Sequence, residues 1–92
     1  MKNNTLDLKK YLWKKRLILI KDNHPEIDGI KEELKINKNK IQSYKIECIF
    51  VKDESSYPIT LIGLDGLVKL EEKNLDLGKI FKLISTMPMA NF

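Results

Sequence analysis

A hairpin signature in the second half of the chain is the feature that most constrains its fold. Two apolar runs flank Asp65-Gly66, and Pro58 precedes the first run. Asp-Gly between two apolar runs is a strong hairpin signal, because both residues tolerate the positive φ that a two-residue turn requires. We therefore predict strands at about 59–63 and 67–71, joined by a turn in which Asp65 and Gly66 both have positive φ.

The first half of the chain alternates between helix and strand signals. A short helix capped by a threonine is expected over about 5–13, and the branched apolar run 17–20 is typical of a central strand covered on both faces. A second helix is expected to begin at Pro25 and to end or fray within 36–42, where asparagines weaken helix formation. Alternating apolar residues then predict a strand over 45–52.

The last part of the chain predicts one amphipathic helix. Asn74 is expected to cap this helix, and Pro88 to end it because proline cannot continue helical hydrogen bonding. The elements then run helix, strand, helix, strand, strand, strand, helix. We therefore predict a single α/β domain over 1–92 with a four-stranded mixed sheet. The apolar stripe of the last helix consists of Leu77, Ile80, Phe81 and Ile84.

The positive charge of the chain is carried almost entirely by lysine. The formal net charge is +4, the isoelectric point is about 9.2, and Arg16 is the one arginine. Proteins that read nucleic acids usually rely on arginine for bidentate contacts to bases and phosphates. We therefore interpret the lysines as a solvated exterior and rank nucleic acid below protein as a partner.

The cysteine content and the apolar runs bear on the compartment. Cys48 is the one cysteine, which excludes an internal disulfide and a CxxC pair. The apolar run 17–20 is too short for a signal peptide or a membrane span. We expect a soluble protein of the cytoplasm, or of an organelle interior (stroma or matrix) if the chain is organelle-encoded.

Three blocks of the sequence resemble a family of uncharacterised thioredoxin-like domains. Residues 8–16 match the opening L-x-x-Y-x-W-K-x-R of that family, residues 61–70 resemble its L-I-G-K-D-G-G-x-K-L signature, and residues 84–89 resemble its closing I-D-x-M-P-M. The family has lysine, glycine and aspartate at three positions where this chain differs. Those positions are Leu64, Leu67 and Ser85.

The resemblance implies a minimal thioredoxin-like sandwich, in which a β-α-β unit is followed by a β-hairpin and a helix, with a further helix at the N-terminus. It also implies a cis peptide bond between Tyr57 and Pro58, since thioredoxin-like folds place a cis-proline just before the third strand. The family has no settled activity. The resemblance therefore bears on the fold and not on the function.

The positions where a thioredoxin-like enzyme carries its chemistry hold other residues here. Residues 23–25, Asn-His-Pro, occupy the helix start where a redox enzyme needs its cysteine. Cys48 lies in mid-strand, so we expect a buried, unreactive thiol. His24 has no second histidine for a metal site and is expected to cap the helix at the surface. Asp22 and Asp53 both follow predicted parallel strands and leave a cation or acid–base role open, but we predict no catalytic residue, cofactor or metal.

We predict a non-catalytic domain that binds another protein, as a small subunit or accessory factor of a larger assembly. Aromatic, arginine and methionine side chains are enriched in interface cores, and here they lie near both ends of the chain. Core packing is the alternative role for the aromatic residues. Two other functions stay open, a nucleic-acid or ribonucleoprotein accessory binder and a thiol-redox or cation-dependent enzyme. The candidate partner-binding residues are Tyr11, Trp13, Arg16, Met87, Pro88 and Met89, and the candidate structural residues are Pro58, Asp65 and Gly66.

Overall fold

The computed structural model describes residues 8–52 and 57–86. This part of the chain holds one 3₁₀ helix, three α-helices and four strands, and none of these helices is long and apolar enough to cross a membrane. In chain order the elements are η1 (Leu8–Tyr11), β1 (Arg16–Lys21), α1 (Ile27–Ile36), α2 (Lys38–Ser43), β2 (Ile46–Val51), β3 (Ile59–Ile62), β4 (Val68–Glu72) and α3 (Leu77–Ser85).

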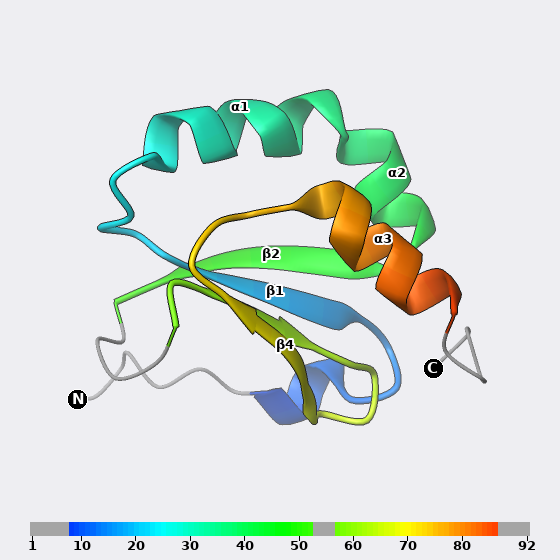
Figure 1. Ribbon diagram of the computed structural model, residues 1–92. Coiled ribbons are helices and arrows are strands. Elements are labelled where there is room, and N and C mark those ends of the chain that lie inside the picture. Colours follow the sequence, from blue (N-terminus) through cyan, green and yellow to red (C-terminus); the bar gives the residue numbers. More distant parts are fainter. Residues whose placement is uncertain (1–7, 53–56, 87–92) are drawn as a thin grey trace.

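The four strands form one mixed sheet in the order β2-β1-β3-β4 (Figure 1). β1 pairs in parallel with β2, and β3 pairs antiparallel with both β1 and β4. Parallel pairing of β1 with β2 needs a long crossover, which α1 and α2 supply. The predicted α/β class and the four-stranded mixed sheet are confirmed.

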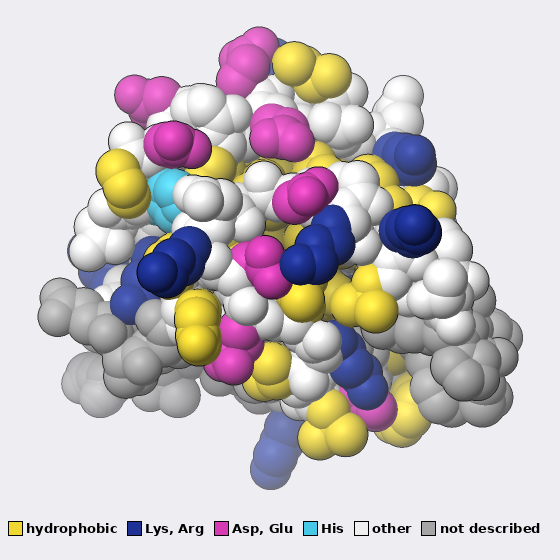
Figure 2. Space-filling view, in the orientation of Figure 1, with side chains coloured by type: hydrophobic (Ala, Val, Ile, Leu, Met, Phe, Trp, Pro, Cys, Tyr) yellow, Lys and Arg dark blue, Asp and Glu magenta, His cyan; other side chains and the backbone are white. Residues whose placement is uncertain are grey.

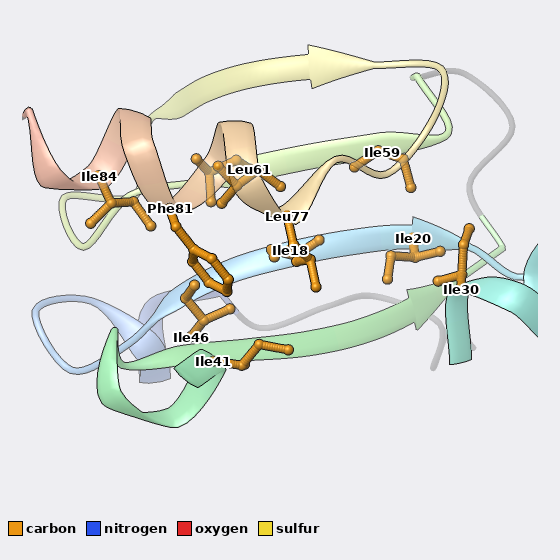
Figure 3. Close-up of a cluster of buried hydrophobic side chains, with 11 residues drawn as sticks. Ile18, Ile20, Ile30, Ile41, Ile46, Ile59, Leu61, Leu77, Phe81 and Ile84 are labelled. Atoms are coloured by element: carbon orange, nitrogen blue, oxygen red, sulfur yellow. The ribbon is translucent and has the colours of Figure 1, made fainter. Parts of the chain in front are cut away.

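The three α-helices cover one face of the sheet, where the main core lies (Figure 3). Side chains alternate across a strand, so every second residue of β1 and β3 points toward the helices. η1 lies on the opposite side of the sheet in Figure 1. The predicted stripe of α3 is buried as expected. The core consists of Ile18, Ile20, Ile30, Ile41, Ile46, Ile59, Leu61, Leu77, Ile80, Phe81 and Ile84.

Two helix boundaries are set by polar side chains. Asn37 separates α1 from α2, within the interval predicted for a helix end, and its Nδ2 donates to the Glu33 carbonyl oxygen at 2.9 Å. α3 is capped by Asp76, whose Oδ1 accepts the Lys79 N–H at 3.1 Å. The prediction that Asn74 caps this helix was wrong. Leu75 packs against the core before the helix begins, so the cap falls to Asp76.

The first helix is a single 3₁₀ turn within the described residues. It ends at Tyr11, and Trp13 has a φ of +62°, in the left-handed region through which a right-handed helix cannot continue. The predicted helix over 5–13 is therefore shorter at its C-terminal end than expected. Its predicted start lies outside the described residues.

The β3–β4 hairpin is present, but its turn is longer than predicted. Gly66 has a φ of +82°, as predicted, whereas Asp65 does not have positive φ. The Gly66 N–H donates to the Gly63 carbonyl oxygen at 3.0 Å, and a register shift follows beside Ile62. The prediction for Asp65 was wrong because the turn uses its carboxylate instead, with Oδ1 accepting the Leu67 N–H at 3.1 Å.

The peptide bond between Tyr57 and Pro58 is trans, since the described residues contain no cis peptide bond. The predicted cis bond was therefore wrong. The trans isomer is the intrinsically favoured one. In this geometry the Pro58 carbonyl oxygen already accepts the Lys21 N–H at 2.9 Å, directly before β3 begins.

Candidate functional site

Large apolar side chains are exposed at the end of the sheet where β1 begins. Trp13 is 60% exposed, Leu67 61% and Val68 55%. Trp13 follows η1, while Leu67 and Val68 lead from the hairpin turn into β4. We refer to these three residues as the Trp13 surface. Figure 2 shows hydrophobic side chains at this lower end of the molecule.

Backbone contacts hold the two segments of the Trp13 surface together. The Trp13 N–H donates to the Leu64 carbonyl oxygen at 2.8 Å. The Leu12 side chain lies so close to the turn that a Cβ atom on Gly66 would stand 2.8 Å from Leu12 Cδ2. The left-handed backbone of Trp13 costs about 1–2 kcal/mol relative to a right-handed conformation. The fold therefore presents an exposed indole on a strained but anchored backbone.

The hairpin turn is braced by one ion pair. Lys69 Nζ lies 2.9 Å from Asp65 Oδ2, and this hydrogen bond, with a second from the Leu67 N–H, lowers the pKa of the Asp65 carboxyl. The Lys69 side chain crosses the turn at Gly63, where a Cβ atom would stand 2.6 Å from Lys69 Cε. A side chain at position 63 would therefore displace the Lys69 side chain from this path. The bracing fixes Leu67 and the start of β4.

The structure does not bring Tyr11, Trp13 and Arg16 into one exposed cluster. Arg16 is buried, with Nη1 donating to the Tyr44 carbonyl oxygen at 2.6 Å, and burial lowers the pKa of its guanidinium. Tyr11 is half-buried, and Lys10 Nζ lies 5.3 Å from its ring centroid. Of these three candidates only Trp13 presents most of its side-chain area to solvent.

Lysines surround Trp13 in the sequence. Lys9, Lys10, Lys14 and Lys15 are all exposed, and each lies within four residues of Trp13. Lys15 pairs with Glu47 at 3.2 Å. An apolar centre with a lysine-rich rim is typical of a protein-binding surface.

The opposite end of the sheet is closed by His24. Its Nδ1 accepts the Glu26 N–H at 3.0 Å, while its Nε2 lies 2.9 Å from the Lys73 carbonyl oxygen, which fixes the neutral tautomer protonated at Nε2. His24 therefore holds the turn that leads into α1, whose N-cap residue is Glu26 and has no side-chain cap, and it is only 5% exposed. The predicted surface position was wrong, because the loop between β4 and α3 covers the ring. Asp22 is exposed, and Asp53 lies outside the described residues.

Cys48 lies in β2 and packs against the main core, but it is half-buried and not fully buried as predicted. Burial, and then the negative charge of Glu47, raise the pKa of the Cys48 thiol to about 11. A thiol with this pKa is almost fully protonated at neutral pH and is a weak nucleophile. Within the residues that the structure describes, no three His, Cys, Asp or Glu side chains are grouped to hold a metal ion.

The remaining candidates, Met87, Pro88 and Met89, lie outside the described residues. Leu67 and Val68 were not among the predicted site residues. A signal for them was present: two apolar residues directly follow the Asp-Gly pair, and Leu67 stands where the resembled family has glycine.

No family model matches the chain, and no curated protein or solved structure is significantly similar to it. The functional interpretation therefore depends on the residues of this chain alone.

Proposed function

We propose that this chain is a non-catalytic domain that docks onto another protein through the Trp13 surface. One observation carries the proposal: Trp13, Leu67 and Val68 are each more than half exposed, although they come from two segments that the backbone ties together. Isolated exposed apolar residues are ordinary, whereas a group of them at one place marks an interaction site.

A thioredoxin-like fold is part of the same proposal. The strand order, with β1 between a parallel β2 and an antiparallel β3, agrees with the β-α-β unit and hairpin that the sequence resemblance implies. The position of a redox cysteine is taken by His24, whose two ring nitrogens are both engaged in hydrogen bonds to the backbone. This supports a role in binding over one in thiol chemistry.

The test is capture from the cells that make the protein, with tagged full-length variants. Trp13→Ala and Leu67→Ala should each weaken binding of the captured partner by about 1 kcal/mol or more, which is at least fivefold in Kd. Ile36→Ala is the matched control, because Ile36 is 73% exposed on α1, away from the Trp13 surface. The Kd is then measured with purified partner by calorimetry.

Three results separate this proposal from its alternatives. Equal capture by all variants would place the interface elsewhere. Loss of the captured material on nuclease treatment, with a steep dependence on salt, would favour a nucleic-acid binder that uses the lysine-rich segment around Trp13. Insulin reduction that disappears in Cys48→Ser would favour a thiol-redox enzyme.

A further inference from the structure

The two outer strands of the sheet differ in how their edges are protected. β4 carries Lys69, Glu71 and Glu72 and has a register shift where it meets β3. Charged side chains and bulges of this kind discourage pairing with another strand. β2 reads Ile-Glu-Cys-Ile-Phe-Val, with Glu47 as its one charged residue. Among the described residues β2 pairs only with β1. Its outer edge lacks the charges and the bulge that protect β4, so it can pair with another strand.

The hydrogen bonds to β1 show which backbone groups of β2 point outward. The Arg16 N–H donates to the Lys45 carbonyl oxygen, and the Asp22 N–H donates to the Val51 carbonyl oxygen. Backbone groups alternate in direction along a strand, so the odd-numbered residues of β2 bond to β1. The N–H and C=O groups of the even-numbered residues, which are Ile46, Cys48 and Phe50, point away from the sheet.

The second half of β2 is the accessible part of this edge. Ile46 is only 3% exposed, and α2 packs against β2 at this end (Figure 3). Phe50 is 40% exposed, with Lys31 Nζ 5.6 Å from its ring centroid. An incoming strand can therefore reach the outward groups of Cys48 and Phe50, together with an uncovered aromatic ring.

We propose that β2 pairs with β2 of a second copy of this chain, antiparallel and about a two-fold axis through Ile49. In this register Cys48 of each copy forms hydrogen-bonded pairs with Phe50 of the other, which gives four new backbone hydrogen bonds. Ile49 faces Ile49 across the axis, and Val51 faces Glu47. The two sheets then become one continuous sheet with an isologous interface.

The other registers fit less well. An axis through Cys48 needs the buried Ile46 as a pairing partner, and it sets the two Glu47 side chains diagonally beside each other. An axis through Phe50 needs Lys52, which lies beyond the end of β2. Parallel in-register pairing places Glu47 directly against Glu47, which is unfavourable. With the axis at Ile49 the two Glu47 residues lie about 13 Å apart along the strands, each beside its own Lys15.

Cross-linking at the axis tests the register. Ile49→Cys in a Cys48→Ser background should form an intermolecular disulfide under mild oxidation, because facing residues of a non-hydrogen-bonded pair have Cα atoms about 4.5 Å apart, within disulfide reach. Val51→Cys in the same background is the matched control, since Val51 faces Glu47 of the second copy and not itself. Absence of the Ile49→Cys cross-link, or equal cross-linking of the control, overturns the proposal.

Sedimentation of the unmodified chain tests the dimer itself. We expect a dimer whose fraction rises with protein concentration and disappears in Phe50→Glu, a change that Lys31 accommodates within one copy. Glu71→Lys, at an exposed position on the β4 edge and outside the Trp13 surface, is the control and should leave the dimer intact. Circular dichroism establishes that both variants are folded. A chain that stays monomeric at every concentration overturns the proposal, even if Phe50→Glu reduces capture of some other protein at this edge.

Discussion

The two ends of the sheet differ in whether their large side chains are buried and hydrogen-bonded or exposed to solvent. Where β1 ends, His24 is buried and both of its ring nitrogens are bonded to backbone groups. Where β1 begins, Trp13 is exposed on a left-handed backbone beside the exposed Leu67. The carboxyl ends of parallel strands are the usual place for a ligand site in α/β folds. In this chain the His24 ring occupies that end and bonds to the backbone. The exposed apolar side chains lie at the opposite end.

The two ends of the sheet should contribute to different properties, one to stability and the other to binding. Residues at the His24 end should matter mainly for the free energy of unfolding, because their contacts lie within the chain. Residues of the Trp13 surface should matter mainly for binding, because their side chains contact solvent in the isolated domain.

The largest expected effect is at His24. His24→Ala removes two part-buried hydrogen bonds, to the Glu26 N–H and to the Lys73 carbonyl oxygen, each worth about 0.5–1.5 kcal/mol. It also removes the packing of a ring that is only 5% exposed. We expect a loss of about 3 kcal/mol in the free energy of unfolding, measured by urea denaturation. Asp22→Ala, an exposed neighbour, should change it by less than about 0.5 kcal/mol. Equal effects of the two variants would show that the His24 end is not closed by these hydrogen bonds.

Gly66 should come next, because it holds the hairpin turn under the Trp13 surface. Gly66→Val places a β-branched residue at a φ of +82° and a Cβ atom 2.8 Å from Leu12, for a cost of about 2 kcal/mol. Gly66→Ala should cost less, about 1 kcal/mol, because it lacks the branched methyl groups. Urea midpoints measure both changes. A neutral valine substitution would contradict the turn geometry.

Two of the described residues other than glycine have a left-handed backbone, and only one of them lies on the Trp13 surface. Trp13 and Lys45 have φ values of +62° and +59°, so glycine at either position relieves strain and should stabilise the chain by up to about 1 kcal/mol. Trp13→Gly should nevertheless abolish partner binding, whereas Lys45→Gly should leave it unchanged. Thermal unfolding and the partner Kd report the two properties. If Trp13→Gly destabilises the chain strongly, the indole contributes to packing. The Trp13 surface would then matter for stability as well as for binding.

The smallest effect should be the pH dependence contributed by Asp65. Its hydrogen bonds to Lys69 and to the Leu67 N–H lower the pKa of Asp65 in the folded state. Its contribution is therefore complete above the unfolded pKa of about 4 and is lost as pH falls through the folded value. Asp65→Asn should make the decline of the urea midpoint below about pH 4 shallower. Lys69→Met should reduce the same slope, and an unchanged slope in both variants would contradict the bracing of the turn.

The elements of the fold could be predicted because their signals are local. The alternation in β2, the stripe of α3 and the glycine of the hairpin turn each depend on neighbours a few residues away. The burial of His24 and Arg16 could not be predicted in this way. Their partners, Lys73 and Tyr44, lie 49 and 28 residues away along the chain, and only the packed sheet brings them together.

The candidate site was predictable only in part for a related reason. Trp13 stands out in the sequence as an aromatic residue among lysines, and it is exposed as an interface residue requires. The other half of the Trp13 surface comes from the hairpin turn. The turn lies close to Trp13 because the Trp13 N–H donates a hydrogen bond to the Leu64 carbonyl oxygen. No local sequence pattern predicts this contact.

The central place of β1 in the sheet has a consequence for how the protein is made. β1 is synthesised before both of its neighbours, and its antiparallel partner β3 lies in the second half of the sequence. On the ribosome, Ile18 and Ile20 therefore have no complete sheet to enter until residues 59–62 have emerged. Pairing across such sequence separations is slow compared with closing a local hairpin. The nascent chain passes through a stage in which the apolar residues of its central strand are exposed. This is the stage at which a chaperone would have the most effect on yield.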